Sequence, residues 1–240
     1  MLKEVTPYNT QESKKAQVED MFDNIAPKYD LLNHTLSMKI DVLWRDKLVK
    51  WLKKDRPKEV LDVATGTGDL AIAVHRGTSA RVFGLDLSQQ MLNVGIEKIE
   101  KAGLASGISM QKGDAENLPF EDNKFDAVTV AFGVRNFENL TKGLSELRRV
   151  VKEGSSVYIL EFSKVEGILA PFYMFYFRNI LPMIGRMVSK DDRAYSYLPD
   201  SVNAFPYGEK MKGILTEVGF KAVEYKKLSL GIATIYKATK

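Results

Sequence analysis

An acid and two glycines stand close together in the stretch "VLDVATGTGD", residues 60–69. An apolar run ends around Asp62, and Gly66 and Gly68 follow two positions apart. Glycines just past a strand let the backbone approach a ligand closely, because no Cβ stands in the way. The stretch "GTGDLA" also satisfies the dinucleotide pattern G-x-G-x-x-A, which is weak support on its own. The spacing therefore indicates a cradle for an adenosine-containing cofactor and leaves open whether that cofactor is a dinucleotide.

Asp86 follows 18 residues after Gly68, at the place where an acid binds the ribose hydroxyls of any adenosine cofactor. Three other features favour a cofactor other than a nicotinamide dinucleotide. Asp62 lies four residues before Gly66, where it would repel a pyrophosphate but suit an ammonium group. Asp114, in "KGDAENLPF", is placed to accept a hydrogen bond from an adenine amino group. The chain also finishes with two strands that predict a hairpin instead of a second mononucleotide-binding half.

The composition limits the classes of protein to consider. With 240 residues, 45% of them hydrophobic, the chain is long enough to bury one sizeable core, so we expect a single domain over residues 1–240. The absence of cysteine excludes disulfides, thiolate metal sites and cysteine nucleophiles. A net charge of +4 is too small to indicate nucleic-acid binding. No apolar run reaches the roughly 20 residues of a membrane-spanning helix, and we expect a cytoplasmic protein.

The elements that must position these residues alternate along the chain. Short β-branched runs separated by amphipathic segments predict an α/β fold, a mostly parallel sheet with helices on both faces. The last strand is expected to be antiparallel. Strands are predicted at 59–64, 80–87, 108–114, 125–132, 156–162, 221–228 and 232–239, and helices at 69–75, 88–101, 139–151 and 209–218.

Two segments depart from this alternation. Residues 1–20 are polar, and we expect them to be partly mobile. Residues 18–56 are predicted to form an N-terminal helical lid, whose basic helix at 39–54 suits either solvent or an anionic lipid surface. Residues 163–200 are aromatic and interrupted by prolines, which predicts an irregular insertion on the substrate side. Its run "PFYMFYF" is expected either to pack inside a lid or to contact a prenyl tail or a membrane surface.

Several motifs together resemble a known family. "VLDVATGTGD", "LDLSQQML", "GDAENLPF" and "FDAVTVAFGVRN" are similar to the successive motifs of class I S-adenosylmethionine-dependent methyltransferases, which have a Rossmann-like sheet. "MFDNIAPKYDLLN", "FGVRN", "LEFSK" and "YSYLPDSV" narrow the resemblance to the ubiquinone/menaquinone biosynthesis C-methyltransferase family. The similarity runs from about Val18 to the end of the sequence.

The resemblance implies a cofactor site made from the loops after the strands. The Gly66-Thr67-Gly68 loop would support the amino-acid tail of S-adenosylmethionine, with Asp62 near its ammonium. Asp86 would bind the ribose hydroxyls. Family members often have a serine before the FG of "FGVRN", and Ala131 stands there instead, so only its backbone is expected to contact the cofactor. The expected cofactor-binding residues are Asp62, Gly66, Thr67, Gly68, Asp86, Asp114, Ala115 and Ala131; no metal is expected.

The resemblance also places catalysis at "FGVRN". Arg135 and Asn136 would face the substrate, Arg135 stabilising an oxyanion and Asn136 helping to hold a water. Tyr29 and Asn33 of the lid would contact the substrate as well. The alternative is that these four residues only cap helices or form surface ion pairs. A neighbouring carboxylate could take the proton in place of the water, and His34 is kept as a less favoured base.

The implied reaction moves a methyl group from S-adenosylmethionine to a ring carbon of reduced demethylmenaquinone. Alternatives are the methoxybenzoquinol of ubiquinone biosynthesis, both substrates, or, more remotely, an NAD-dependent oxidoreductase or a non-catalytic RNA-associated protein. The expected partners are a polyprenyl hydroquinone, a transient membrane-surface contact on the inner face of the membrane and, as an open alternative, a second copy in a homodimer. No nucleic-acid partner is expected.

Overall fold

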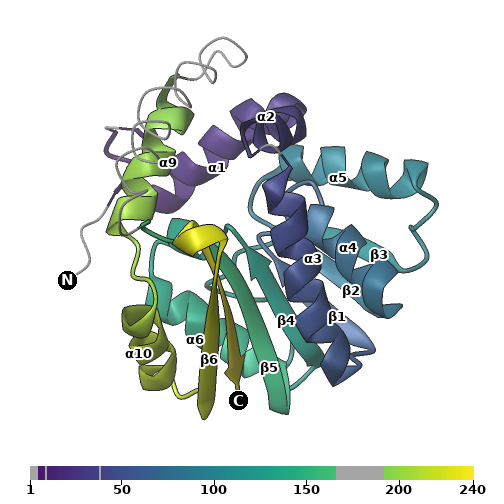
Figure 1. Cartoon of the computed structure of the whole chain (residues 1–240). Coiled ribbons are helices and arrows are strands. Elements are labelled where there is room, and N and C mark those ends of the chain that lie inside the picture. The colour runs from purple at the N-terminus through teal and green to yellow at the C-terminus, as the bar shows by residue number, and fades with distance from the viewer. Residues whose placement is uncertain (1–4, 9, 38, 166–191) are drawn as a thin grey trace.

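Seven strands form one mixed sheet in the computed structural model, which describes residues 5–8, 10–37, 39–165 and 192–240 (Figure 1). Their spatial order is β3-β2-β1-β4-β5-β7-β6. β7 runs antiparallel to its neighbours β5 and β6, and the other strand pairs are parallel, which confirms the predicted mostly parallel sheet with an antiparallel last strand. The strands are β1 (Glu59–Val63), β2 (Arg81–Asp86), β3 (Ile108–Lys112), β4 (Phe125–Ala131), β5 (Val151–Phe162), β6 (Ala222–Leu228) and β7 (Ala233–Thr239).

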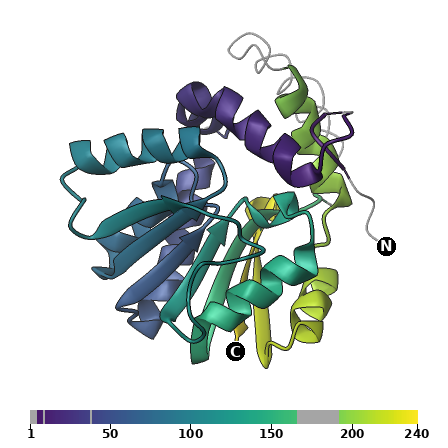
Figure 2. The ribbon, with the colours of Figure 1, turned by 180° about the vertical axis from the view of Figure 1, so that it is seen from behind.

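Helices cover both faces of the sheet because the strand side chains alternate between two apolar cores. Val60 packs with α3 (Ile40–Leu52) and α4 (Asp69–Thr78) on one face. Leu61 packs with α6 (Leu140–Val150) and α10 (Glu209–Glu217) on the other. Figure 1 shows the first face and Figure 2 the second. The helix α5 (Gln89–Lys101) flanks β2 and β3. The strand order reverses between β1 and β4, which is where ligands bind in sheets of this kind.

The N-terminal lid begins earlier than expected. The helix α1 (Lys14–Ile25) is followed by the 3-10 turn η1 (Ala26–Lys28) and by α2 (Tyr29–Leu36). Residues 14–20, which were expected to be partly mobile, form the first part of this helix, and Ser13 caps α1 by accepting a hydrogen bond from the backbone of Ala16. The helix also buries Gln17, Val18, Met21 and Ile25. In Figures 1 and 2, α1 and α2 lie across the end of the sheet where the parallel strands finish.

The segment predicted as an irregular insertion contains one regular element. The helix α9 (Asp192–Ala204) occupies its last part and has Pro199 inside it, so the expectation of an irregular chain is wrong there. In both views α9 lies beside α1 (Figures 1 and 2). The run "PFYMFYF" lies outside the described residues. Within the part of the chain that is described, no helix has the length and apolar character needed to cross a membrane.

Candidate functional site

A cavity lies beneath α1, at the carboxyl ends of β1, β2 and β4. It contains about 720 Å³ of space free of protein atoms, including its open mouth. Five of the residues predicted for the cofactor and two of those predicted for the substrate line it. These are Gly66, Asp86, Asp114, Ala115 and Ala131, with Tyr29 and Asn136.

The loop after β1 takes a conformation that favours glycine. Gly66 and Gly68 have φ angles of 55° and 80°, in the left-handed region where a Cβ is strained. Asp62 lies beneath this loop, 1% exposed and not against the cavity. Its carboxylate accepts hydrogen bonds from the hydroxyls of Thr65 at 2.7 Å and Thr129 at 2.6 Å. Burial raises the pKa of Asp62 to about 6, although both hydroxyls oppose that shift.

Asp86, at the end of β2, joins the loop after β1 to the loop after β2. Its two carboxylate oxygens accept hydrogen bonds from the backbone N–H groups of Gly66 at 2.8 Å and Ser88 at 2.9 Å. Burial raises the pKa of Asp86 to about 6 against these bonds. A carboxylate offers about four acceptor sites, so the group can still accept from a ligand's hydroxyls beside these backbone donors and that of Leu87.

Asp114 lies in the loop after β3 and contacts the lid. One of its oxygens accepts from the backbone N–H of Glu116, and the other lies 2.6 Å from the ammonium of Lys15 on α1. The carboxylate of Asp114 is the largest cause of a raised pKa at Lys15. The group predicted for the adenine is therefore already paired with a lid cation in this structure.

The charges around the cavity decide what kind of ligand fits it. Of the described lining residues, five are acidic and one, Lys15, is basic. Acidic walls suit a cofactor that carries positive charge and would repel a pyrophosphate. Apolar groups complete the lining and provide contacts for a flat ring. The acidic residues are Glu19, Asp86, Asp114, Glu116 and Glu138, and the apolar ones include Leu85, Leu87, Met91 and Ala115. These residues fit an adenosine cofactor with a cationic sulfur and an ammonium group.

Arg135 is held in a buried ion pair behind the loop that follows β4. Its side chain is 8% exposed, and its Nη1 lies 2.8 Å from the carboxylate of Glu161, which is fully buried. The same nitrogen donates a hydrogen bond to the carbonyl oxygen of Phe132. The Nε–H of Arg135 is buried and has no hydrogen-bond partner among the described residues. A buried donor without a partner is costly and indicates a place where a ligand accepts.

The other predicted substrate residues lie around this guanidinium. The side-chain oxygen of Asn136 accepts a hydrogen bond from the hydroxyl of Tyr197 at 3.1 Å. Burial raises the pKa of Tyr29, whereas the positive charges of Arg45 and Arg135 and a hydrogen bond with Asn33 oppose the shift. Both guanidinium groups are thus close enough to the Tyr29 hydroxyl to influence it.

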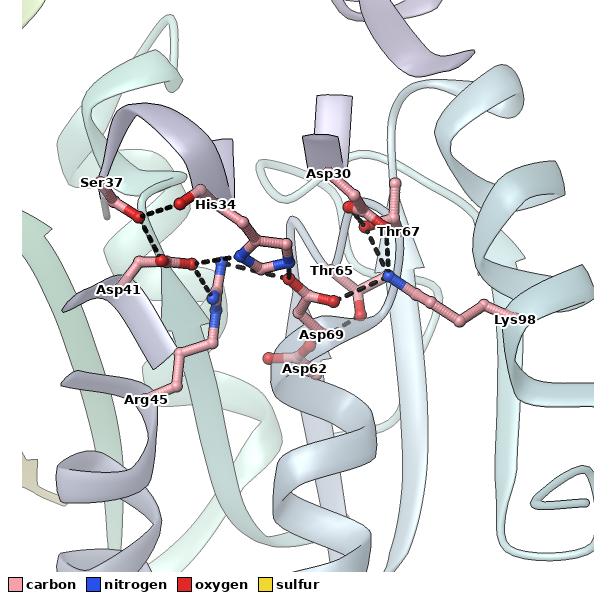
Figure 3. A network of polar contacts seen from close by, with 10 residues as sticks. All are labelled: Asp30, His34, Ser37, Asp41, Arg45, Asp62, Thr65, Thr67, Asp69 and Lys98. Carbon is pink, nitrogen blue, oxygen red and sulfur yellow. Dashed lines mark hydrogen bonds and ion pairs between the residues drawn. The ribbon is translucent and has the colours of Figure 1, made fainter. Parts of the chain in front are cut away.

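A network of charged side chains fastens the lid to the glycine loop (Figure 3). The ammonium of Lys98 lies 2.6 Å from Asp30 and 2.7 Å from Asp69, and Asp30 also accepts a hydrogen bond from Thr67. Thr67 therefore faces the lid in this structure, and like Gly68 it does not line the cavity.

His34 lies in the same network, with its ring nitrogens 3.1 Å from Asp41 and 3.3 Å from Asp69 (Figure 3). Asp30, His34 and Asp69 are close enough together to bind a metal ion. The ammonium of Lys98 pairs with both acids and the guanidinium of Arg45 also lies 3.5 Å from Asp69, so the arrangement needs no metal. That the reaction needs no metal stays a prediction.

Three residues near the site were not predicted. Arg45 was counted among the basic residues of a solvent- or lipid-facing helix, but it is 8% exposed and its guanidinium contacts Asp41 and Asp69. Lys15 lies in a polar stretch without any motif. Glu161 lies within "LEFSK", a motif that carried the family resemblance, but its role required knowing that β5 ends beside Arg135.

Residues 10–240 match the sequence profile of the ubiE/COQ5 methyltransferase family. The demethylmenaquinone methyltransferase of Bacteroides fragilis is 50% identical over 98% of this chain and 97% of its own length. The ubiquinone/menaquinone biosynthesis C-methyltransferase UbiE of Geotalea daltonii is 44% identical over 95% of this chain and 97% of its own. A crystal structure of a possible histamine N-methyltransferase from Thermotoga maritima, an S-adenosylmethionine-dependent methyltransferase, shares the fold. Its TM-score is 0.65 at 19% identity, covering 92% of this chain and 99% of that one.

Proposed function

The chain belongs to the ubiE/COQ5 methyltransferase family, and on that premise we propose that it methylates a ring carbon of reduced demethylmenaquinone to give menaquinol. The chain is an S-adenosylmethionine-dependent methyltransferase, and its family acts in quinone biosynthesis. The observation that carries the proposal is the unpartnered Nε–H of Arg135, which belongs to the same loop as Gly133 and Asn136 of the acid-rich cavity.

The cavity residues divide the binding of the cofactor among them. S-adenosylmethionine, when bound, supplies a methyl group on a sulfonium, which is an electrophilic carbon. Asp86 would accept hydrogen bonds from the ribose hydroxyls, and Asp114 and Ala115 would hold the adenine. The backbone of the loop from Gly66 to Gly68 would support the amino-acid tail. Asp62 supports that loop from below through Thr65 and would contribute negative charge near the ammonium.

The acceptor's hydroxyl must lose its proton as the neighbouring ring carbon attacks. A phenolic proton has a pKa near about 10, so stabilising the oxyanion is the main electrostatic task. Arg135 can donate from Nε to that oxygen and stays charged throughout, which makes it a poor base. Asn136 would orient a water that takes the proton, while Tyr29 and Asn33 would contact the acceptor from the lid.

A benzoquinol acceptor is the second candidate, because the relative from Geotalea daltonii is named for both the ubiquinone and the menaquinone pathway. Labelled methyl transfer from S-adenosylmethionine to short-chain demethylnaphthoquinol and to the matching methoxybenzoquinol, in separate detergent assays, tests both. Label in the naphthoquinol alone supports menaquinone synthesis, and label in both supports a dual-pathway enzyme. No label in either, despite tight binding of S-adenosylhomocysteine, would show that the proposed acceptor is wrong.

A transient membrane contact is proposed for delivery of the prenylated acceptor. Leu31, Leu43 and Leu230 are 65%, 65% and 76% exposed. They lie on α2, at the start of α3 and between β6 and β7, near the end of the sheet that carries the cavity (Figure 1). Co-sedimentation with neutral and anionic vesicles tests this contact, and no binding to either would oppose it. The cytoplasmic location and the homodimer stay predictions.

A further inference from the structure

Glu161 buries a carboxylate completely at the end of β5. Such burial is costly unless the charge is paired and both oxygens accept hydrogen bonds. Oε1 accepts from Nη1 of Arg135 and from the backbone N–H of Phe162, each at 2.8 Å. Oε2 accepts from the backbone N–H of Arg135 at 3.3 Å. The carboxylate therefore binds both the backbone and the side chain of one residue, Arg135.

This arrangement fixes one end of the guanidinium. Nη1 has two N–H donors, and both are used, one by Glu161 and one by the carbonyl oxygen of Phe132. Nε lies on the other edge of the planar fork. Its N–H is buried and has no hydrogen-bond partner within the described part of the chain. The guanidinium can thus be held rigidly by Nη1 while the Nε–H stays available.

The unpartnered donor belongs to a loop that borders two adjoining cavities. Arg135 lines the second cavity, which shares Phe137 and Glu138 with the cofactor cavity. Phe132, Gly133 and Asn136 of the same loop line the cofactor cavity itself. The guanidinium carbon lies 5.5 Å from the ring centroid of Phe162, and that ring packs against Phe132 at 4.6 Å. Arg135 also influences Tyr29, which lines the same cavity from the lid.

We propose that Glu161 is a positioning residue for methyl transfer, which anchors one end of the Arg135 guanidinium so that its Nε–H donates to the acceptor's oxygen. This inference rests on the proposed function. Glu161 also acts through its charge, because its carboxylate compensates the positive charge of Arg135 and the ion pair is neutral. The oxyanion then meets a fixed hydrogen-bond donor and not an uncompensated cation.

Two substitutions separate position from charge. Glu161→Asp keeps the charge but shortens the side chain, so the guanidinium loses its anchor. We expect kcat to fall by about ten- to a hundredfold, as for a small misplacement of a catalytic group, with an unchanged pH profile. Glu161→Gln keeps the length but leaves the cation uncompensated. It should favour ionisation of the bound acceptor and move the rising limb of the kcat profile down by about 0.5–1 pH unit.

The other groups that face this ion pair must be considered in the pH profile. Tyr29 and Tyr197 face Arg135 from α2 and α9, Lys14 of α1 donates to its carbonyl oxygen, and Tyr236 of β7 faces Glu161. A direct readout avoids their contribution to turnover. The absorbance of bound 1-naphthol, titrated in the presence of S-adenosylhomocysteine, reports ionisation of a phenol at the acceptor position, and Glu161→Gln should lower its apparent pKa.

The matched control is Tyr158→Phe, which removes a buried hydrogen bond to Asp55 from the same strand. It should lower the melting temperature and leave both the pH profile of kcat and the titration of bound 1-naphthol unchanged. Glu161 variants that behave like this control, or that keep kcat within twofold of the wild type, would overturn the positioning role. If wild-type protein methylates neither quinol, the proposed function fails instead, and the 1-naphthol titration then decides the role of Glu161 alone.

Discussion

The cofactor cavity has a floor, formed by the loops after β1 and β2, and a lid, which includes α1 and α2. Different interactions hold the two parts together. In the floor, backbone N–H groups and buried hydroxyls donate to carboxylates at strand ends, as at Asp62 and Asp86. In the lid, long charged side chains reach across to the domain. The pair Lys15–Asp114 is 30% exposed on both sides, and Lys112–Glu19 is 48% and 28% exposed. The floor should therefore set affinity and chemistry, while the lid makes smaller, salt-dependent contributions.

The largest effect expected is that of Arg135→Ala. Loss of the oxyanion donor should lower kcat by about a hundred- to a thousandfold, with binding of S-adenosylhomocysteine within about twofold of the wild type. Turnover of the quinol and calorimetric binding measure the two quantities. Arg149→Ala, which breaks a surface ion-pair cluster with Glu146 and Asp122, is the control and should keep kcat. Equal losses of turnover and cofactor binding would contradict the assigned role.

Asp86→Asn should mainly weaken cofactor binding. Loss of a charge-assisted acceptor costs about 1.5–3 kcal/mol, so the Kd for S-adenosylhomocysteine should rise by about ten- to a hundredfold. Because burial raises the pKa of Asp86 to about 6, wild-type affinity should weaken as the pH falls through 6, and the variant should lose that dependence. Asp122→Asn, on an exposed carboxylate, is the control. A wild-type Kd that is flat between pH 7 and about 5 would contradict the prediction.

Asp62→Asn tests what the floor costs in stability. A carboxyl whose pKa is raised on folding favours the folded state at low pH, and that contribution is lost as the pH rises through its folded pKa of about 6. The ligand-free variant should therefore be more stable than the wild type at pH 8, by about 1–3 kcal/mol, and the gain should shrink towards pH 4. Urea denaturation of the variant and the wild type at these two pH values measures the difference in their free energies of unfolding.

The control substitution for this test should change the stability of the protein in the opposite direction. Asp126 accepts hydrogen bonds from the backbone N–H groups of Lys58 and Glu59 and pairs with Lys152; these interactions outweigh burial and lower its pKa. Asp126→Asn should destabilise the protein at pH 8. This loss of stability should disappear as the pH falls below the ordinary pKa range of a carboxyl group. Destabilisation by both variants at pH 8 would refute the account of Asp62.

The smallest effect expected is in the lid. Lys15→Gln removes a partly exposed ion pair, and the dissociation rate of S-adenosylhomocysteine should rise by only about two- to fivefold, with less difference at high salt. Stopped-flow displacement measures the rate. Lys101→Gln removes a similar but far more exposed pair with Glu97 and should change nothing. A tenfold or larger effect of Lys15→Gln would mean that the lid, and not the floor, sets the affinity.

The same division explains what could be predicted from the sequence. The strands and the loop from Gly66 to Gly68 follow local patterns, so the positions of the strands along the chain, their mostly parallel direction and the place of the glycine loop could be predicted. Asp86 and Asp114 were placed correctly at strand ends because a parallel sheet brings those ends together. The boundaries were less exact, since β5 begins at Val151 and includes a bulge opposite β4.

The lid could not be predicted in the same way. Lys15 meets Asp114 across 99 residues, and Lys98 meets Asp30 across 68. Nothing in the local sequence specifies such partners, because any surface lysine has the same pattern around it. Arg45 was misjudged for the same reason: helical spacing placed it on a basic helix, whereas its burial depends on Asp69 of α4 and the ring of Phe132.

The position of β7 has a consequence for synthesis of the chain. β7 leaves the ribosome after the six other described strands, yet it lies inside the sheet, between β5 and β6. Until its residues emerge, β5 keeps an open edge of backbone hydrogen-bonding groups, and β6 has no partner strand. Open strand edges pair readily with other chains. A nascent or prematurely terminated chain that lacks β7 should therefore tend to aggregate through β5.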